Sequence, residues 1–338
     1  MTAPRAIILD CAGPALSPDE RAFLRDADPW GFILFARHVE TPEQVARLCG
    51  GLRDAVGRDA PVLIDQEGGR VARLRRPHWR EWPWMSAMRA GLAPEAMDEA
   101  LRWRFRLIAR ELRALGVDVD CMPMADLPVA GAHRIVTDRA LGDTAEAVGR
   151  RARIVADALL AGGVLPVLKH LPGHGRAFAD SHAALPRVRA SLEALRETDF
   201  AAFRPVADLP LGMTAHVAFD ALGGEAATVS PAAIRAIREE IGFDGLLMTD
   251  DLAMEALGGG MGGRARASLA AGCDVLLLCN ADRAAQTEAL AETPELAGAA
   301  LARAEAALAA RRLPEPFDEA EAEAEARHAR IVEALADA

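Results

Sequence analysis

One short stretch of the chain gathers a lysine, three histidines and an aspartate. It runs Lys169-His-Leu-Pro-Gly-His-Gly175 and closes with Asp180-Ser-His182. The apolar run at 164–168 predicts a buried strand before it. Pro172 and the two glycines stop a helix and let the backbone approach a ligand. A buried strand that leads directly into such a loop is typical of an active site. The alternative is a polar surface loop with scattered histidines.

A second group of side chains could supply the rest of a catalytic pair. Asp250 and Asp251 directly follow the apolar run 246–249, and a carboxylate at the end of a buried strand is held stiffly, as a nucleophile requires. Asp180 beside His182 would orient the imidazole and stabilise its protonated form. That histidine could give a proton to a leaving oxygen and later take one from water. A nucleophilic aspartate with a proton donor is the logic of a retaining glycosidase, although the usual acid there is a second carboxyl group.

Eight short apolar runs alternate with helical segments along the chain. The predicted strands are 6–9, 31–35, 61–64, 117–122, 164–168, 211–214, 245–249 and 274–278, and the clearest helices are 42–56, 94–115, 144–161, 191–206 and 231–241. Eightfold alternation predicts an α/β fold with a single (β/α)8 TIM-type barrel. The nearly continuous apolar strands fit a parallel sheet that helices cover. An open doubly wound sheet is the alternative.

The whole chain, 1–338, is expected to form one catalytic barrel domain. Residues 294–338 are rich in Ala, Glu and Arg, which predicts a helical C-terminal extension packed on the barrel. Polar residues cluster at the predicted strand ends, where barrels of this kind place their chemistry. They are Asp65 with the following Gln66–Arg70, Asp126, Lys169, His170, His216, Asp250, Asp251 and Asn280.

Composition narrows the classes of partner. The net charge of -11 argues against a nucleic-acid-binding protein, for which a basic patch is expected. It also gives no reason to expect binding to anionic lipid. The five cysteines are odd in number, widely spaced and without a CxxC pair, which favours reduced thiols. No signal peptide or membrane span is apparent, so we expect a cytoplasmic protein that does not bind membranes.

Four segments together resemble glycoside hydrolase family 3. They are Leu-Ile-Asp-Gln-Glu-Gly-Gly-Arg-Val-Ala-Arg at 63–73, the loop at 169–182, Met-Thr-Ala-His at 213–216 and the segment from Gly-Phe-Asp-Gly to Thr-Asp-Asp at 242–251. The resemblance runs from about Ile7 to Asn280. Within the family, the chain is similar to the bacterial cytoplasmic β-N-acetylglucosaminidases (β-hexosaminidases) of peptidoglycan recycling, and the Asp-Ser-His ending of the loop marks that branch.

This resemblance implies a role for each candidate residue. Asp250 would be the nucleophile that forms a covalent glycosyl-aspartate, and His182 would be the acid/base with Asp180 as its partner. The enzyme would be a retaining exo-β-N-acetylglucosaminidase without metal or cofactor. Its substrate would be the small carbohydrate N-acetylglucosaminyl-1,6-anhydro-N-acetylmuramic acid, with or without peptide, and no obligate protein partner is evident. The N-acetylglucosamine would be held by Asp65, Arg73, Arg139, Lys169 and His170.

The chain departs from the family pattern at two places. The family usually shows Ile-Gly-Asp-Arg-Ser-Phe-Gly where this chain has Val-Thr-Asp-Arg-Ala-Leu-Gly at 136–142. Thr137 does not suit a position of positive φ, so the local turn beside Arg139 is expected to differ. The family's Phe-x-Arg-Asn appears as Phe-Ala-Arg-His at 35–38. Three tryptophans, Trp79, Trp82 and Trp84, could stack on a ligand or cover the barrel edge.

Three alternative functions remain open at this point. A metal-dependent barrel hydrolase could use His170, His174, His182 and Asp180 as ligands, although the first strand lacks the His-x-His common in such enzymes. A glycoside phosphorylase is possible because a histidine acid/base adds no negative charge that would repel phosphate. A sugar-binding barrel without catalysis needs neither Asp250 nor His182.

Overall fold

A computed structural model describes residues 3–177 and 185–316, together with scattered residues between 323 and 335. Eight parallel strands close into a barrel in the order β1, β10, β9, β7, β5, β4, β3, β2, so the predicted (β/α)8 barrel is confirmed. The strands are β1 (Arg5–Leu9), β2 (Pro29–Leu34), β3 (Val62–Ile64), β4 (Val119–Asp120), β5 (Leu165–Leu171), β7 (Leu211–Thr214), β9 (Leu246–Asp251) and β10 (Val275–Leu278). Two short strands, β6 (Arg187–Val188) and β8 (Ala218–Phe219), pair separately.

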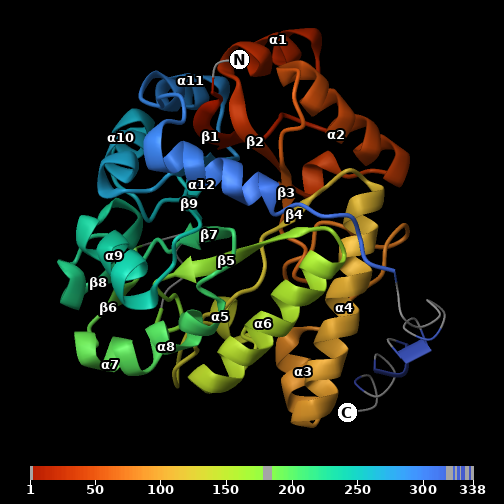
Figure 1. Cartoon of the computed structure of the whole chain (residues 1–338), viewed down its shortest axis with the longest axis vertical. Coiled ribbons are helices and arrows are strands. Elements are labelled where there is room, and N and C mark those ends of the chain that lie inside the picture. The colour runs from red at the N-terminus through yellow and green to blue at the C-terminus, as the bar shows by residue number, and fades with distance from the viewer. Residues whose placement is uncertain are drawn as a thin grey trace.

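Helices surround this barrel (Figure 1). They are α1 (Pro18–Ala27), α2 (Pro42–Val56), α3 (Met85–Gly91), α4 (Pro94–Ala114), α5 (Arg134–Thr137), α6 (Ala145–Ala161), α7 (Leu192–Glu197), α8 (Asp199–Phe203), α9 (Pro231–Arg235), α10 (Met261–Ala271), α11 (Arg283–Ala291) and α12 (Gly298–Ala309). Short 3-10 turns are η1 (Ala36–His38), η2 (Arg204–Val206), η3 (Asp220–Leu222) and η4 (Ala227–Val229), and η5 (Ala236–Ile241) is a π-helix.

Local sequence signals explain where the main helices begin and end. Helix α2 starts after Thr41, whose hydroxyl accepts the backbone N–H of Gln44, and Pro42 occupies its first position. It ends at Gly57, which adopts a positive φ of 65° that glycine accepts without strain. Thr144 caps α6 in the same way. These caps satisfy the amide groups that a helix end leaves unpaired.

The core has two parts that the strands separate. Inward side chains of the strands form a cluster inside the barrel, and outward side chains pack against the helices. Helix α12 crosses the barrel in Figure 1, and its Ala304 and Ala307 join the inner cluster. Arg303 on the same helix binds Asp244 and Asp274, which precede β9 and β10. Helix α12 therefore covers the amino-terminal end of the barrel and leaves the carboxyl-terminal end to the site.

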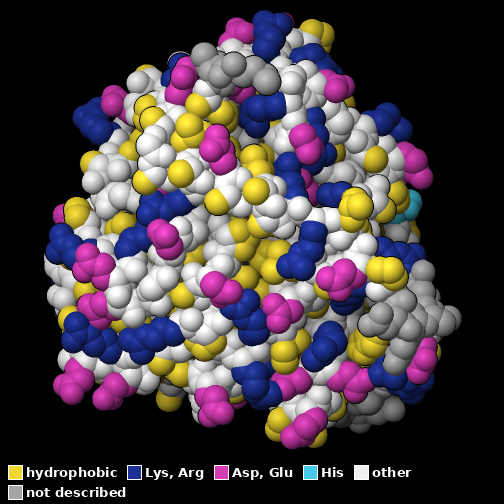
Figure 2. Space-filling model, in the orientation of Figure 1, with side chains coloured by type: hydrophobic (Ala, Val, Ile, Leu, Met, Phe, Trp, Pro, Cys, Tyr) yellow, Lys and Arg dark blue, Asp and Glu magenta, His cyan; other side chains and the backbone are white. Residues whose placement is uncertain are grey.

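The exposed face around α12 carries mixed charge. Figure 2 shows basic and acidic side chains interspersed across this face. In the part of the chain that the structure describes, no helix is long and apolar enough to cross a membrane. The division into one catalytic domain with a helical extension over 294–338 stays a prediction.

Several segments differ from their sequence predictions. Strand β9 includes Asp250 and Asp251, which were expected to follow it, and β4 is shorter than the predicted 117–122. Strand β5 continues through Leu171, so Lys169 and His170 lie on the strand and not in the loop after it. The predicted helix 191–206 is broken at Thr198, whose ψ of -78° separates α7 from α8. The predicted helix 231–241 changes from α to π geometry at Ala236. The spacing of apolar residues alone cannot reveal a break in a helix or a change to π geometry, because a continuous helix would bury a similar face of the segment.

Candidate active site

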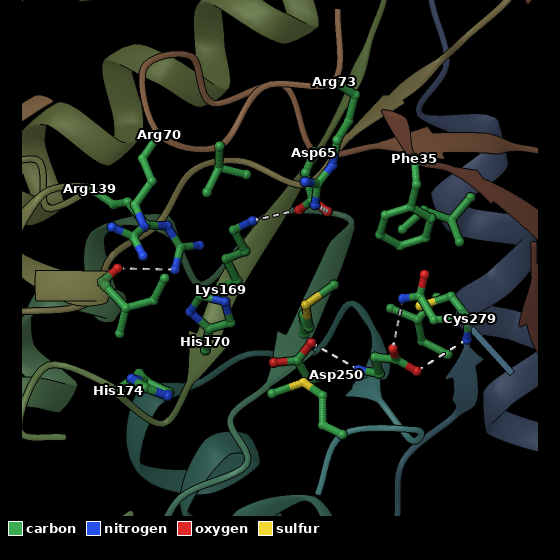
Figure 3. A pocket seen from close by; sticks show the side chains of 18 residues that line it. Phe35, Asp65, Arg70, Arg73, Arg139, Lys169, His170, His174, Asp250 and Cys279 are labelled. Atoms are coloured by element: carbon green, nitrogen blue, oxygen red, sulfur yellow. Dashed lines mark hydrogen bonds and ion pairs between the residues drawn. The ribbon is translucent and has the colours of Figure 1, made fainter. Parts of the chain in front are cut away.

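The carboxyl-terminal end of the barrel holds a cavity of about 300 Å³. Side chains reach it from the ends of β3, β5, β9 and β10 and from the segments after β2 and β4 (Figure 3). In (β/α)8 enzymes the active site lies at this end, where the loops of several strands meet. The cavity is lined by Ile33, Phe35, Asp65, Arg70, Val71, Arg73, Ile135, Arg139, Lys169, His170, His174, Met213, Asp250, Asp251, Met254, Leu277, Cys279 and Asn280.

Most of the predicted site residues meet around this cavity, although they come from distant parts of the sequence. Asp180 and His182 lie outside the described residues. The chemical roles assigned to all eight residues stay predictions. Those that line the cavity are Asp65, Arg73, Arg139, Lys169, His170 and Asp250.

Charged side chains beside the cavity form one paired cluster. The Nζ atom of Lys169 lies 2.9 Å from Asp65 Oδ1 and 2.7 Å from Glu67 Oε1. Arg73 donates to the other oxygen of Asp65 at 3.0 Å. Arg139 binds both oxygens of Glu67, at 2.9 and 2.7 Å. Buried charges need such pairing, and the pairing holds three cations in fixed positions at the cavity.

These contacts keep both acids of the cluster ionised. Burial alone would raise the pKa of Asp65, but the Lys169 ammonium and the Arg73 guanidinium hold that pKa well below its ordinary value. Burial of Glu67 is likewise outweighed by Arg139 and Lys169, which lower its pKa to about 2. The pKa of Lys169 is raised because Asp65 and Glu67 outweigh its burial. At neutral pH the cluster is fully charged.

Glu67 is the cluster member whose role the sequence did not single out. It lies two residues after Asp65 and is followed by Gly68 and Gly69, whose φ values are 86° and 59°. These glycines turn the chain back so that Arg73 returns to Asp65. A side chain at Gly68 would also collide with the buried guanidinium of Arg104, 1.9 Å away. The sequence feature that could have identified Glu67 is a second carboxylate close to Asp65 and next to a pair of glycines.

His170 is oriented by a carboxylate from the segment after β4. Its Nδ1 lies 2.7 Å from Asp126 Oδ2, and Asp126 Oδ1 accepts the backbone N–H of His174 at 2.6 Å. Burial would raise the pKa of Asp126, but His170 outweighs it and the pKa is lowered. An ionised carboxylate only accepts hydrogen bonds, so Nδ1 carries the proton. Nε2 is then the polar atom that His170 offers to the cavity.

Asp250, the last residue but one of β9, is an ionised carboxylate. Its Oδ1 accepts the backbone N–H of Asp251 at 2.8 Å (Figure 3). Burial raises the pKa of Asp250, but His216 and His170 outweigh burial, and the net pKa lies below its ordinary value. A carboxylate must be ionised to act as a nucleophile. The structure therefore places a group of suitable charge at the cavity.

The neighbouring Asp251 is tied into the barrel. Its Oδ1 accepts the backbone N–H groups of Ala253 and Cys279 at 2.9 and 3.1 Å, and Asn280 Nδ2 lies 3.3 Å from Oδ2. Burial raises its pKa above the ordinary value. Asp251 thus joins β9 to the segment after β10. Of the two neighbouring carboxylates, Asp250 is the one less occupied by contacts among the described residues.

His216 supports this strand end from the side. It is fully buried, and its Nε2 lies 2.9 Å from the carbonyl oxygen of Asp251. Because a carbonyl only accepts, Nε2 donates, and Nδ1 faces the Thr228 hydroxyl at 2.7 Å. Burial lowers the pKa of His216. The ring therefore braces the backbone that carries Asp250.

The structure explains both places where the chain departs from the family pattern. Thr137 ends the short helix α5 and is not among the described residues of positive φ, so the turn beside Arg139 is helical and fits threonine. His38 is buried, accepts the backbone N–H of Phe35 at 2.8 Å and contacts the carbonyl of Cys11 at 2.7 Å. It joins the segments after β1 and β2.

The three tryptophans lie away from the cavity lining. Trp82 is buried and Trp79 packs against the core, whereas Trp84 is 41% exposed. The positions of Trp79 and Trp82 support a packing role. No group of three or more His, Cys, Asp or Glu residues in the described part of the chain could hold a metal ion; two of the ligands considered for a metallohydrolase, Asp180 and His182, fall outside that part.

Comparison with known proteins decides the family. The glycosyl hydrolase family 3 N-terminal domain matches residues 8–312. The chain belongs to glycosyl hydrolase family 3. Among curated members, a β-hexosaminidase of Methylococcus capsulatus is 38% identical over 283 residues, which cover 82% of this chain and 83% of that protein. A β-hexosaminidase of Pseudomonas aeruginosa is 38% identical over 299 residues, covering 86% and 87%.

One solved structure is similar to this chain over its whole length. The crystal structure of NagZ from Neisseria gonorrhoeae in complex with N-trifluoroacetyl-D-glucosamine is 28% identical, with a TM-score of 0.85 and 99% of each chain covered. The chain is thus a glycoside hydrolase by family. The named relatives are hydrolases, so these similarities do not favour the phosphorylase alternative.

Proposed function

We propose that this family 3 protein is a retaining exo-β-N-acetylglucosaminidase. It releases N-acetylglucosamine from peptidoglycan fragments, of which N-acetylglucosaminyl-1,6-anhydro-N-acetylmuramic acid with or without peptide is the expected form, and it works in the cytoplasm. The observation that carries the proposal is the ionised Asp250 facing the same cavity as the paired cluster of Asp65, Lys169 and Arg139. The β-hexosaminidase relatives at 38% identity support the choice of sugar.

The proposed reaction proceeds in two displacements. A carboxylate oxygen of Asp250 attacks the anomeric carbon, the bond to the glycosidic oxygen breaks, and His182 gives its proton to that oxygen. The product of this step is a glycosyl ester on Asp250 and a free aglycone. Water then attacks the anomeric carbon, the bond from that carbon to the Asp250 oxygen breaks, and the water gives a proton to His182, with Asp180 orienting the imidazole throughout. Two inversions retain the β configuration, and the step needs no cofactor because the side chains supply the nucleophile and the proton.

The polar cluster explains selection of the sugar. Asp65 and His170 offer polar atoms to the cavity, and Arg73, Arg139 and Lys169 add fixed donors. A site built to hydrogen-bond a substrate group leaves buried atoms unpaired when that group is missing, so it can discriminate strongly. Because Asp250 attacks directly, the acetamido group serves recognition and does not act as the nucleophile.

The test is a matched pair of aryl glycosides. We expect kcat/KM for the β-N-acetylglucosaminide to exceed that for the β-glucoside by at least a hundredfold, in line with pockets that read a polar substituent. Proton NMR at early times should show the β anomer of free N-acetylglucosamine. Comparable kcat/KM for the two sugars, an α product, or formation of sugar 1-phosphate only when phosphate is added would overturn the proposal.

A further inference from the structure

One cation that lines the active-site cavity does not belong to the paired cluster. The other three cations of the lining each lie within 3.0 Å of a carboxylate. Arg70 instead lies 3.8 Å from Asp138 Oδ2, and its guanidinium makes no hydrogen bond to any residue that the structure describes. Its side chain is 40% exposed. The guanidinium of Arg70 therefore keeps its hydrogen-bond donors for a ligand.

The carboxylate beside Arg70 faces two cations. Asp138 Oδ2 lies 3.5 Å from Arg134 Nε as well as 3.8 Å from Arg70. This buried oxygen has no hydrogen-bond partner within the described ranges. The charge of the neighbouring Arg139 is already balanced by Glu67. Two guanidinium groups around one carboxylate leave an excess of positive charge at this edge of the cavity, which favours an anionic ligand.

The chemistry and position of Arg70 indicate what that anion is. A guanidinium presents its N–H groups in a planar fork that matches the two oxygens of a carboxylate. In Figure 3, Arg70 and Arg139 lie together on one side of the cavity, and Asp250 lies on the other. A carboxylate bound by Arg70 therefore belongs to a part of the substrate that points away from the nucleophile.

The chain that leads to His182 leaves from the same side of the cavity. Ala177 is the last described residue before His182, and its carbonyl oxygen accepts the backbone N–H of His133 at 2.9 Å. His133 caps the start of α5, and Asp138, the neighbour of Arg70, caps its end. In the proposed reaction the leaving oxygen faces away from the nucleophile and takes the proton of His182. The aglycone is therefore expected on the side of Arg70.

We infer that Arg70 binds a carboxylate of the aglycone and makes the enzyme prefer anionic aglycones. This inference rests on the proposed function, which supplies the direction in which the aglycone leaves. The paired cluster holds the N-acetylglucosamine, so Arg70 affects the choice of aglycone and not the choice of that sugar. Because Arg70 is partly exposed, salt should screen its attraction for an anion.

The test compares three disaccharide substrates. N,N′-diacetylchitobiose has a neutral aglycone, and β-1,4-linked N-acetylglucosaminyl-N-acetylmuramic acid adds a lactyl carboxylate to the same aglycone. The third substrate carries L-alanine on that lactyl group, which moves the carboxylate outward. The two acids together distinguish a carboxylate on the sugar from one on an attached peptide.

Three variants are assayed with these substrates. Arg70→Gln removes the charge, and Arg70→Lys keeps the charge but loses the planar fork. Arg76→Gln is the matched control, because Arg76 follows in the same segment, is exposed, pairs with Glu81 and does not line the cavity. Thermal unfolding of each variant reports whether it is folded.

We expect the ratio of kcat/KM for at least one acid to that for the neutral disaccharide to fall about tenfold in Arg70→Gln, the size of a lost hydrogen bond to a charged group. The fall should be smaller in Arg70→Lys and absent in Arg76→Gln. About 0.5 M NaCl should lower the ratio in the wild type but not in Arg70→Gln. If Arg70→Gln does not fold, Arg70→Lys and the salt dependence of the wild type decide.

An unchanged ratio for both acids in the folded Arg70 variants overturns the inference. A wild type that is inactive on the neutral disaccharide and on an aryl N-acetylglucosaminide overturns the proposed function instead.

Discussion

Replacing Glu67 by glutamine should cost the protein a large and pH-dependent part of its stability. The substitution keeps the volume of the side chain but removes the charge that faces Arg139 and Lys169. The pKa of Glu67 is about 2 in the folded protein against an ordinary value of 4.5. At about 1.4 kcal/mol for each pH unit, that difference corresponds to roughly 3 kcal/mol at pH 7. Breaking a buried ion pair typically costs about 3–5 kcal/mol, which is the same order.

The pH dependence has a definite sign. Because the folded protein lowers the pKa of Glu67, the ionised carboxylate stabilises the fold above pH 4.5, and this contribution is lost as the pH falls towards 2. The difference in free energy of unfolding between wild type and Glu67→Gln should therefore shrink from roughly 3 kcal/mol at pH 7 to roughly 1 kcal/mol at pH 3.

Urea unfolding of both proteins at the two pH values measures this difference. Glu305→Gln, on the exposed surface of α12, is the control and should stay within about 0.5 kcal/mol of wild type. A loss below about 1 kcal/mol at pH 7, or a loss that is the same at pH 3, would show that Glu67 is not the charged centre of the cluster.

Three further substitutions test separate parts of the account. Asp126→Asn should lower kcat/KM about 10- to 100-fold, because the amide keeps only one acceptor oxygen for the two N–H groups, of His170 and His174, that bind the carboxylate. Steady-state kinetics with an aryl glycoside measure this, and an unchanged value would exclude the orienting role. Gly175→Ala should destabilise the fold by at least about 1–3 kcal/mol, since a β carbon there would lie 1.8 Å from the carbonyl oxygen of Leu127; a melting temperature equal to that of wild type would contradict this packing. His182→Ala should slow glycosylation about 10²–10⁴-fold with a sugar aglycone but less with an activated aryl group that needs little protonation, and equal losses on both would argue against an acid role.

The barrel could be predicted from sequence because its signal is local. Each strand is a short apolar run bounded by turn residues, and eight such runs in alternation with helices leave few possible folds. The predicted ends of the strands were less accurate. Strand β5 extends three residues beyond its predicted end, because Lys169 and His170, although polar, are buried by their partners. A charged residue inside a strand cannot be recognised before its partner is known.

Site residues could be predicted from sequence where a reactive residue type stands at the end of a predicted strand. Contacts between segments that are distant in the sequence could not be predicted. Asp250 is visible as a carboxylate directly after the apolar run 246–249. The contact between His170 and Asp126 spans 44 residues, and nothing in either local sequence specifies it.

The identity of the nucleophile is the central claim and has a direct test. A fluorinated N-acetylglucosaminyl donor that forms the glycosyl ester quickly but releases it slowly should trap the enzyme in the first step of the reaction. Proteolysis and mass spectrometry then locate the added sugar. The account predicts one sugar per chain, attached to Asp250, and no label in folded Asp250→Asn. A label on Asp251 or on another residue, or turnover of the donor without any covalent adduct, would contradict it.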